Sequence, residues 1–234
     1  MGKLKSEGTC VYCEKMYAGS GISRHLGSHL KKMEATSKTT KKAFHVRVSA
    51  AEMFLNLLVD GNKPLRELDA FLRAIWLECC GHKSSFEVKE KNYNIDFFND
   101  DDFGEKMDSK MGSIFKKGLA LDYQYDFGST TRLNVKILDE YNLKVPDGVQ
   151  LLSRNEPLHI LCHKCGKQPA SEICTVHLWE GEGLLCKKCA KAHAKTCDDF
   201  DDYARLPVVN SPRMGTCAYE GGRIDIKRDG AWKG

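Results

Sequence analysis

Closely spaced cysteines and histidines between residues 162 and 197 constrain the fold of this chain more than any other feature. Four pairs occur there, with the spacings C-x2-C, C-x2-H, C-x2-C and H-x3-C. Zinc takes four thiolate or imidazole ligands in a tetrahedron, and a two-residue gap lets both members of a pair reach one ion. The sequence therefore predicts zinc ligands at Cys162, Cys165, Cys174, His177, Cys186, Cys189, His193 and Cys197.

The even spacing of these pairs predicts two interleaved sites. Pairs one and three are expected to share one ion, and pairs two and four the other. His193 and Cys197 are four residues apart, so on a helix they would share one face. Two alternatives stay open: the cysteines are buried or disulfide-bonded, or His159, His163 or Cys217 replaces one of the named ligands.

The chain as a whole predicts a cytoplasmic protein that keeps its thiols reduced. It has 234 residues and eleven cysteines, and it begins without an apolar export signal. No stretch approaches the eighteen apolar residues of a membrane span, so we expect no membrane partner. Without export, eleven cysteines favour metal over disulfides.

Positive charge is concentrated near the N-terminus. The net charge of the chain is +4, but residues 1–47 carry ten Lys or Arg against three acidic residues, which leaves the remainder slightly acidic. Any attraction to the phosphates of a nucleic acid is therefore expected through residues 1–42.

The N-terminal cysteines and histidines have the spacing C-x2-C-x11-H-x3-H. They are Cys10, Cys13, His25 and His29. The segment resembles the two-Cys two-His zinc finger, a ββα unit that folds mainly on its metal. It has one residue fewer than usual between the aromatic core position, Tyr17, and the aliphatic one, Ile22. We assign the finger to residues 1–32, followed by a basic linker over 33–43.

Sequence-specific reading of DNA by this finger is limited. If Ala18, Gly21 and Arg24 occupy the base-reading positions of the helix, only Arg24 can form a bidentate contact with guanine. Contacts of Lys15, Lys31 and Lys32 with the phosphate backbone are easier to support. A structural or protein-binding finger is the alternative.

The middle of the chain predicts an α+β domain over residues 44–145. Phe44, Val46 and Val48 alternate with polar residues, as in a half-buried strand. Apolar residues at helical spacing follow Pro64, and two further strands are expected at 120–126 and 130–138. A Cys/His zinc module with a loop-rich tail is expected over 146–234.

Two segments of this domain resemble a known family. PLRELDAFLRAIWLECCGHKSSF and LDYQYDFGSTTRLNVKIL are similar to the Ri-plasmid ORF-three-like family, whose members are often labelled insertion-element passengers or "TnpR-like". The match covers about residues 44–142, with Ser129 in place of the usual Asp of a strand–YDFGD–strand signature. The tail LPVVNSPRMGTCAYEGG is similar to a cysteine-containing subgroup. The resemblance implies an α+β fold and an association with mobile elements, and it implies no established activity.

Four further residues were weighed as site candidates. Cys79 and Cys80, next to His82, are expected to be small buried hydrophobic residues at a helix end, with a place in a ligand pocket or around a bound ligand as the alternative. Cys217 has no partner in the predicted ligand scheme. Arg213 is predicted to be exposed and is a binding candidate, with a structural ion pair as the alternative.

Together these observations predict a non-enzymatic protein with about three Zn²⁺ ions. Four protein ligands per ion indicate closed, structural sites. The leading hypothesis is a nucleic-acid-associated accessory or regulatory protein linked to mobile elements. The alternative is a protein-interaction adaptor, because residues 162–197 resemble the cross-brace zinc modules of B-box, RING and ZZ domains, which mostly bind proteins.

Overall fold

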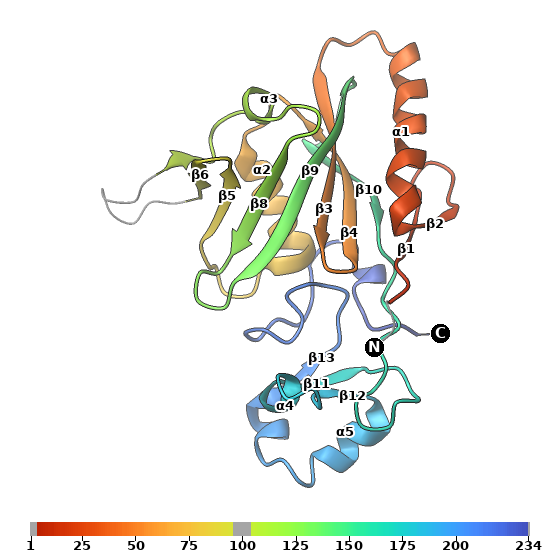
Figure 1. Ribbon diagram of the computed structural model, residues 1–234, viewed down its shortest axis with the longest axis vertical. Coiled ribbons are helices and arrows are strands. Elements are labelled where there is room, and N and C mark those ends of the chain that lie inside the picture. The colour runs from red at the N-terminus through yellow and green to blue at the C-terminus, as the bar shows by residue number, and fades with distance from the viewer. Residues whose placement is uncertain (1–3, 96–103, 234) are drawn as a thin grey trace. The chain divides into compact units, whose positions relative to one another are not determined.

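The computed structural model describes residues 4–95 and 104–233, and the chain divides into two compact units (Figure 1). The N-terminal unit comprises residues 6–73 and 81–155. The C-terminal unit comprises residues 1–5, 74–80 and 156–234. Across the described residues, every helix is too short or too polar to cross a bilayer.

The N-terminal unit is built on one large sheet. Within the described residues its strand order is β10-β4-β3-β9-β8-β5-β6-β7, and all neighbours are antiparallel except β6 and β7. This mixed sheet with its helices confirms the predicted α+β class. The strands are β3 (Lys42–Ala50), β4 (Met53–Asp60), β5 (Ser84–Val88), β6 (Lys91–Asn94), β7 (Glu105–Lys106), β8 (Ala120–Tyr125), β9 (Thr131–Asn142) and β10 (Val149–Arg154).

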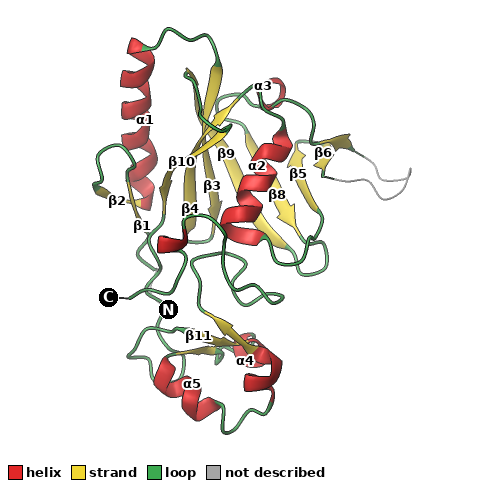
Figure 2. Ribbon diagram, turned by 180° about the vertical axis from the view of Figure 1, so that it is seen from behind, coloured by secondary structure: helices red, strands yellow, loops and turns green. Residues whose placement is uncertain are grey.

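Strand β4 is buried at nearly every position, unlike a strand with one face in water. Its residues alternate between two covered faces of the sheet. α2 (Leu65–Leu72) lies across one face (Figure 2), and α1 (Gly19–Thr36) packs on the other. The apolar run of β4 follows from this double coverage.

Helix α2 begins after Pro64, whose φ of −69° suits a helix start, and buries Leu65, Leu68 and Leu72 at helical spacing. The chain continues without a break into a π-helix, η1 (Arg73–Leu77), in which Trp76 is fully buried. The short helix α3 (Met111–Ile114) ends before Phe115, which takes an extended backbone and is buried.

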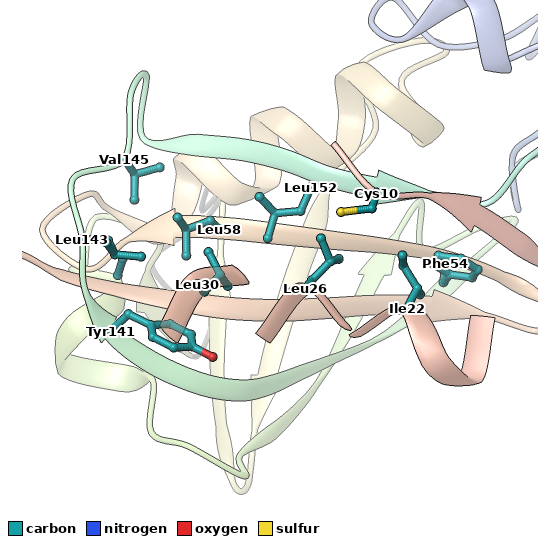
Figure 3. Packing of buried hydrophobic residues seen from close by; sticks show 11 residues of the cluster. Cys10, Ile22, Leu26, Leu30, Phe54, Leu58, Tyr141, Leu143, Val145 and Leu152 are labelled. Carbon is teal, nitrogen blue, oxygen red and sulfur yellow. The ribbon is translucent and has the colours of Figure 1, made fainter. Parts of the chain in front are cut away.

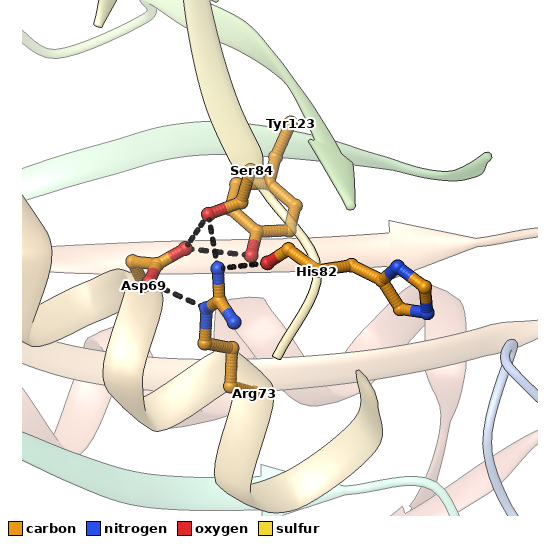
Figure 4. Close-up of polar contacts among 5 residues, drawn as sticks. All are labelled: Asp69, Arg73, His82, Ser84 and Tyr123. Carbon is orange, nitrogen blue, oxygen red and sulfur yellow. Dashed lines mark hydrogen bonds and ion pairs between the residues drawn. The ribbon is translucent and has the colours of Figure 1, made fainter. Parts of the chain in front are cut away.

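A buried polar network ties α2 to the strands beside it (Figure 4). Asp69 Oδ1 accepts hydrogen bonds from Ser84 Oγ at 2.6 Å and from Tyr123 Oη at 2.7 Å. Asp69 Oδ2 accepts from Arg73 Nε at 2.8 Å, and Arg73 Nη2 donates to the carbonyl oxygen of His82 at 2.6 Å. Burial and the Asp69 charge raise the pKa of Tyr123 well above its usual range. The network therefore fixes the backbone at His82.

The large sheet extends beyond the predicted domain end at residue 145. Residues 149–154, predicted to belong to the Cys/His module, form β10 and pair with β4. The segment VQLLSR has buried residues, such as Leu152, that pack at the edge of the sheet beside β4.

The C-terminal unit has a small sheet with the strand order β12-β11-β13 in its described part. The apolar residues Ile173, Leu184 and Leu206 pack together on it. Its elements are β11 (Glu172–Cys174), α4 (Thr175–Leu178), β12 (Leu184–Leu185), α5 (Lys187–His193), the π-helix η2 (Phe200–Ala204), β13 (Arg205–Pro207) and the 3-10 helix η3 (Ile226–Arg228).

Candidate metal centres

The N-terminal cysteines and histidines meet between a hairpin and a helix. β1 (Glu7–Thr9) pairs with β2 (Met16–Ala18), and α1 follows at once. The ligand atoms of Cys10, Cys13, His25 and His29 all lie within 4.8 Å of one another. The Nε2 atom of His25 lies 3.2 Å from Cys13 Sγ and 3.2 Å from His29 Nε2. We call these four residues the N-terminal cluster.

The loop of this cluster favours a thiolate at Cys13. A hydrogen bond from the backbone N–H of Lys15 lowers the pKa of Cys13. Desolvation and the neighbouring His29 lower the pKa of His25, which favours its neutral form. A thiolate and a neutral imidazole are the states that bind zinc.

Helix α1 is anchored to the large sheet by its apolar side (Figure 3). Ile22, Leu26 and Leu30 are fully buried and belong to one hydrophobic cluster with Phe54, Leu58, Tyr141, Leu143, Val145 and Leu152. Gly19 starts the helix against the sheet, where a Cβ atom would approach the Phe54 ring to 2.9 Å. Arg47 Nη1 donates to the Gly19 carbonyl oxygen and to Ser23 Oγ, both at 2.9 Å. The helix is thus part of the core of the N-terminal unit.

The predicted nucleic-acid-binding residues lie on the outside of this module. Arg24, Lys31 and Lys32 are exposed on α1, and Lys15 is exposed in the loop before β2. Arg24 is followed by the two lysines after seven and eight residues, about two helical turns, so the three share one side of the helix. That side is opposite the buried leucines.

Four cysteines of the C-terminal unit form the four-cysteine cluster. Cys162, Cys165, Cys186 and Cys189 have their sulfur atoms within 4.8 Å of one another. The N–H of His163 donates to the Leu184 carbonyl oxygen at 2.7 Å, which places the first pair beside the strand that leads to the third. Cys186 caps α5 and Cys189 lies one turn into it.

The thiols of this cluster differ in acidity. Backbone N–H groups of Gln168 and Lys167 lower the pKa of Cys165 to about 6. Desolvation, followed by hydrogen bonding to Cys186, raises the pKa of Cys189 to about 12. Without metal, the cluster therefore holds a thiolate and at least one thiol in close contact.

Zinc binding to the four-cysteine cluster is expected to strengthen with pH. Zn²⁺ needs the thiolate form, so it must displace the Cys189 proton at neutral pH, and below about pH 6 it must also displace that of Cys165. Each displaced proton changes the apparent affinity about tenfold per pH unit, so the affinity should rise at least tenfold per unit. Competition with a chromophoric chelator between pH 5.5 and 8 measures this slope. Affinity that is independent of pH, after correction for the chelator's own protonation, would contradict it.

The remaining pairs form the mixed cluster, Cys174, His177, His193 and Cys197. Cys174 ends β11, His177 lies in α4, and His193 ends α5. His177 Nδ1 lies 3.2 Å from Cys174 Sγ and 3.9 Å from Cys197 Sγ. His193 Nε2 is buried and has no hydrogen-bond partner among the described residues. A buried nitrogen without a partner fits a metal ligand.

The dimensions of the N-terminal and mixed clusters suit zinc. Zn–S bonds of about 2.3 Å and Zn–N bonds of about 2.0 Å place tetrahedral ligand atoms about 3.3 to 3.8 Å apart. The separations given above run from 3.2 to 3.9 Å. No disulfide joins any of the eleven cysteines, all of which lie in the described part of the chain. Each cluster offers four protein donors, and these residues can hold a metal ion.

The alternative ligands His159 and His163 do not belong to these clusters. The His159 ring lies against Trp232, with centroids 4.1 Å apart. His163 Nδ1 accepts a hydrogen bond from the Leu184 N–H at 3.4 Å. Among the described residues, neither belongs to a group of metal-binding size.

Two features were missed from the sequence. Cys79 and Cys80 are not buried hydrophobic residues: Cys80 is exposed, and both form a fourth group with Cys217 in the C-terminal unit. The count of cysteines could have indicated this group, since these three are the ones left outside the predicted ligand scheme. Arg213, predicted to be exposed, is fully buried.

The second missed feature is a lysine-rich surface. Exposed lysines along and just after α5 line a shallow depression: Lys187, Lys188, Lys191 and Lys195. A neighbouring groove is lined by residues of the four-cysteine cluster together with Lys167, Lys233 and Trp232. The net charge of residues 48–234 is slightly negative, so it gives no indication of this local cluster of lysines.

Comparison with known proteins finds a distant likeness among solved structures. No family model matches the chain, and no curated protein matches it. Among solved structures, it is similar to the crystal structure of a protein of unknown function, MM3350 from Methanosarcina mazei Go1, at 17% identity and a TM-score of 0.40. The alignment covers 46% of this chain and 65% of that chain. Function is therefore inferred from the residues of this chain alone.

Proposed function

We propose that this chain is a zinc-dependent, non-catalytic protein that associates with nucleic acid as an accessory or regulatory factor. The proposal rests on α1, which has one apolar side buried in the core and one positively charged side exposed to solvent. Its leucines are fixed in the core of the N-terminal unit, and Arg24, Lys31 and Lys32 are exposed on the other side. A cationic surface on a rigid helix binds phosphates without first having to be ordered.

The donor sets support a structural role for zinc. The N-terminal, four-cysteine and mixed clusters each supply four Cys or His ligands. Catalytic zinc sites keep one coordination position for water or substrate, whereas structural sites are closed by four protein ligands. Zinc would therefore stabilise the surfaces that bind, and would not itself act on a substrate.

The C-terminal unit adds a second basic surface. Lys187, Lys188 and Lys191 project from α5, and Trp232 lines the adjoining groove. Lysines beside an aromatic ring are typical of sites for single-stranded nucleic acid, where the chain tracks the charge and a base stacks on the ring. This surface supports the same function from a different set of residues.

Binding is expected to show little sequence preference. Of the positions that read bases in a two-Cys two-His finger, Ala18 carries only a methyl group and Gly21 has open space around it. Arg24 alone can distinguish a base by a bidentate contact. The link to mobile elements follows from the family resemblance of residues 44–142, and we propose it on that basis.

Charge reversal on α1 is expected to abolish most duplex binding. In the variant Arg24→Glu/Lys31→Glu/Lys32→Glu, the affinity for a labelled 20-base-pair duplex should fall at least tenfold at 50 mM salt, since each phosphate contact releases counterions. The slope of log affinity against log salt should become shallower by about 2 to 3. Fluorescence anisotropy titrations at several salt concentrations measure both. Deleting residues 1–42 is a poorer test, because it removes buried residues of α1.

A matched control lies in the same unit. Lys106→Glu/Lys110→Glu/Lys116→Glu makes the same change of charge at three exposed lysines between β6 and β8. This variant should bind like the wild type. Equal losses in both triple variants, or no binding by the wild type at low salt, would refute the α1 surface. Loss only on reversal of the α5 lysines would place the site in the C-terminal unit.

One observation favours a protein-interaction adaptor as a second candidate. Trp179, just after α4 in the mixed-cluster segment, is 85% exposed, and Val176 is 40% exposed. Exposed aromatic residues are enriched where partners bind. A partner captured without nucleic acid by the wild type, and lost on Trp179→Ser, would favour this reading over nucleic-acid binding.

A further inference from the structure

We infer that Cys79, Cys80 and Cys217, all in the C-terminal unit, form a fourth zinc site. Their ligand atoms all lie within 4.8 Å of one another, and the Cys80 and Cys217 sulfur atoms are 3.1 Å apart. The inference does not depend on the proposed association with nucleic acid. It gives a role to the three cysteines that do not belong to the other three clusters.

The local backbone explains how two adjacent cysteines reach one point. Cys79 and Cys80 follow η1 in an irregular bend, so neighbouring side chains are not directed apart as they would be in a strand. Gly81 has a φ of +74°, a conformation that glycine adopts without strain, and it turns the chain directly after Cys80.

Cys217 is brought to the cysteine pair by a tail segment that is fixed along η1. Ser211 Oγ donates to the Trp76 carbonyl oxygen at 2.6 Å, and the Arg223 N–H donates to that of Ala74 at 2.7 Å. Cys217 itself has a φ of +53°. Few residues other than glycine adopt this left-handed region, so the surroundings of Cys217 impose its conformation.

A buried cation lies beside this position. Arg213 is fully buried, and its Nη2 atom lies 3.6 Å from Cys79 Sγ. A guanidinium beside a sulfur stabilises the thiolate form, which is the form that binds zinc. Zn²⁺ with three thiolates carries one negative charge, and the adjacent Arg213 offsets it.

Elemental analysis tests the assignment. Zinc-replete wild-type protein, purified under reducing conditions and freed of loose metal by gel filtration, should contain four zinc ions per chain. Cys217→Ser should contain three, and the control Ala218→Ser, at the exposed neighbouring position, should contain four. Three ions in the wild type, or four in Cys217→Ser, would overturn the inference.

Alkylation of the unmodified protein gives a test that does not rely on a variant folding. Cys80 and Cys217 are exposed, so without metal iodoacetamide should reach and alkylate both thiols. With zinc bound, their alkylation in peptide maps should slow at least tenfold, and a chelator should restore it. Equal rates with and without zinc, or a Cys80–Cys217 disulfide in the zinc-replete protein, would exclude the site.

Discussion

The variant Cys186→Ser is expected to unfold the Cys/His module of the C-terminal unit. A structural zinc ion contributes on the order of 10 kcal/mol or more to folding, whereas whole domains are stable by only about 5 to 15 kcal/mol. The apolar residues that pack around Cys186 are few and mostly small, with Leu185, Ala190 and Phe200 among them. Such a core cannot replace the metal.

Hydrogen exchange monitored by mass spectrometry would localise this effect. Peptides from residues 160–207 should lose protection in Cys186→Ser, while those from β3 and β4 should keep it, because the large sheet has its own core. Ala192→Ser, at an exposed position of α5, is the matched control and should exchange like the wild type. Protection over 160–207 that survives both Cys186→Ser and chelation would show that zinc does not hold the module.

Leu26→Ala is expected to destabilise the whole N-terminal unit by about 2 to 5 kcal/mol, the range for a large-to-small change in a packed core. Leu26 is fully buried in the cluster that joins α1 to the large sheet. If the finger folded as an independent domain, the same change would leave the stability of the large sheet unchanged. Urea denaturation followed by circular dichroism measures the shift in the unfolding midpoint.

Ser28→Ala is the control for this prediction. Ser28 is exposed on the same helix, and its hydroxyl donates only to the Arg24 carbonyl oxygen, at 3.3 Å. Exposed substitutions of this kind usually change stability by less than about 0.5 kcal/mol. If Leu26→Ala had no larger effect than Ser28→Ala on unfolding of the sheet, α1 would not belong to its core.

The sequence was most informative where the relevant contacts are local. The separations within each Cys/His pair are two or three residues, which is short enough for spacing to indicate a shared ligand geometry. The structure brings the pairs together in the interleaved order, one with three and two with four. Their role as zinc ligands stays a prediction, to be decided by metal analysis.

Contacts between distant residues could not be derived in this way. The docking of α1 on the large sheet depends on contacts such as Arg47 with Gly19, 28 residues apart. The fourth group joins Cys80 to Cys217 across 137 residues, and its adjacent cysteines do not form a knuckle pattern. The apolar pattern of 149–154 indicates burial, but it does not say which sheet the strand completes.

The π-helix η1 (Arg73–Leu77) sets the direction in which the cysteine pair that follows it points. A π-helical turn holds more residues than an α-helical one, and such turns are frequent at functional sites. Wound as an α-helix at about 100° per residue, the same five residues would rotate those after them by roughly the angle of one residue. Cys79 and Cys80 would then point away from Cys217, and the Trp76 carbonyl would turn from Ser211. The π-helical winding of this segment, and not only its residue types, therefore sets where the cysteine pair points.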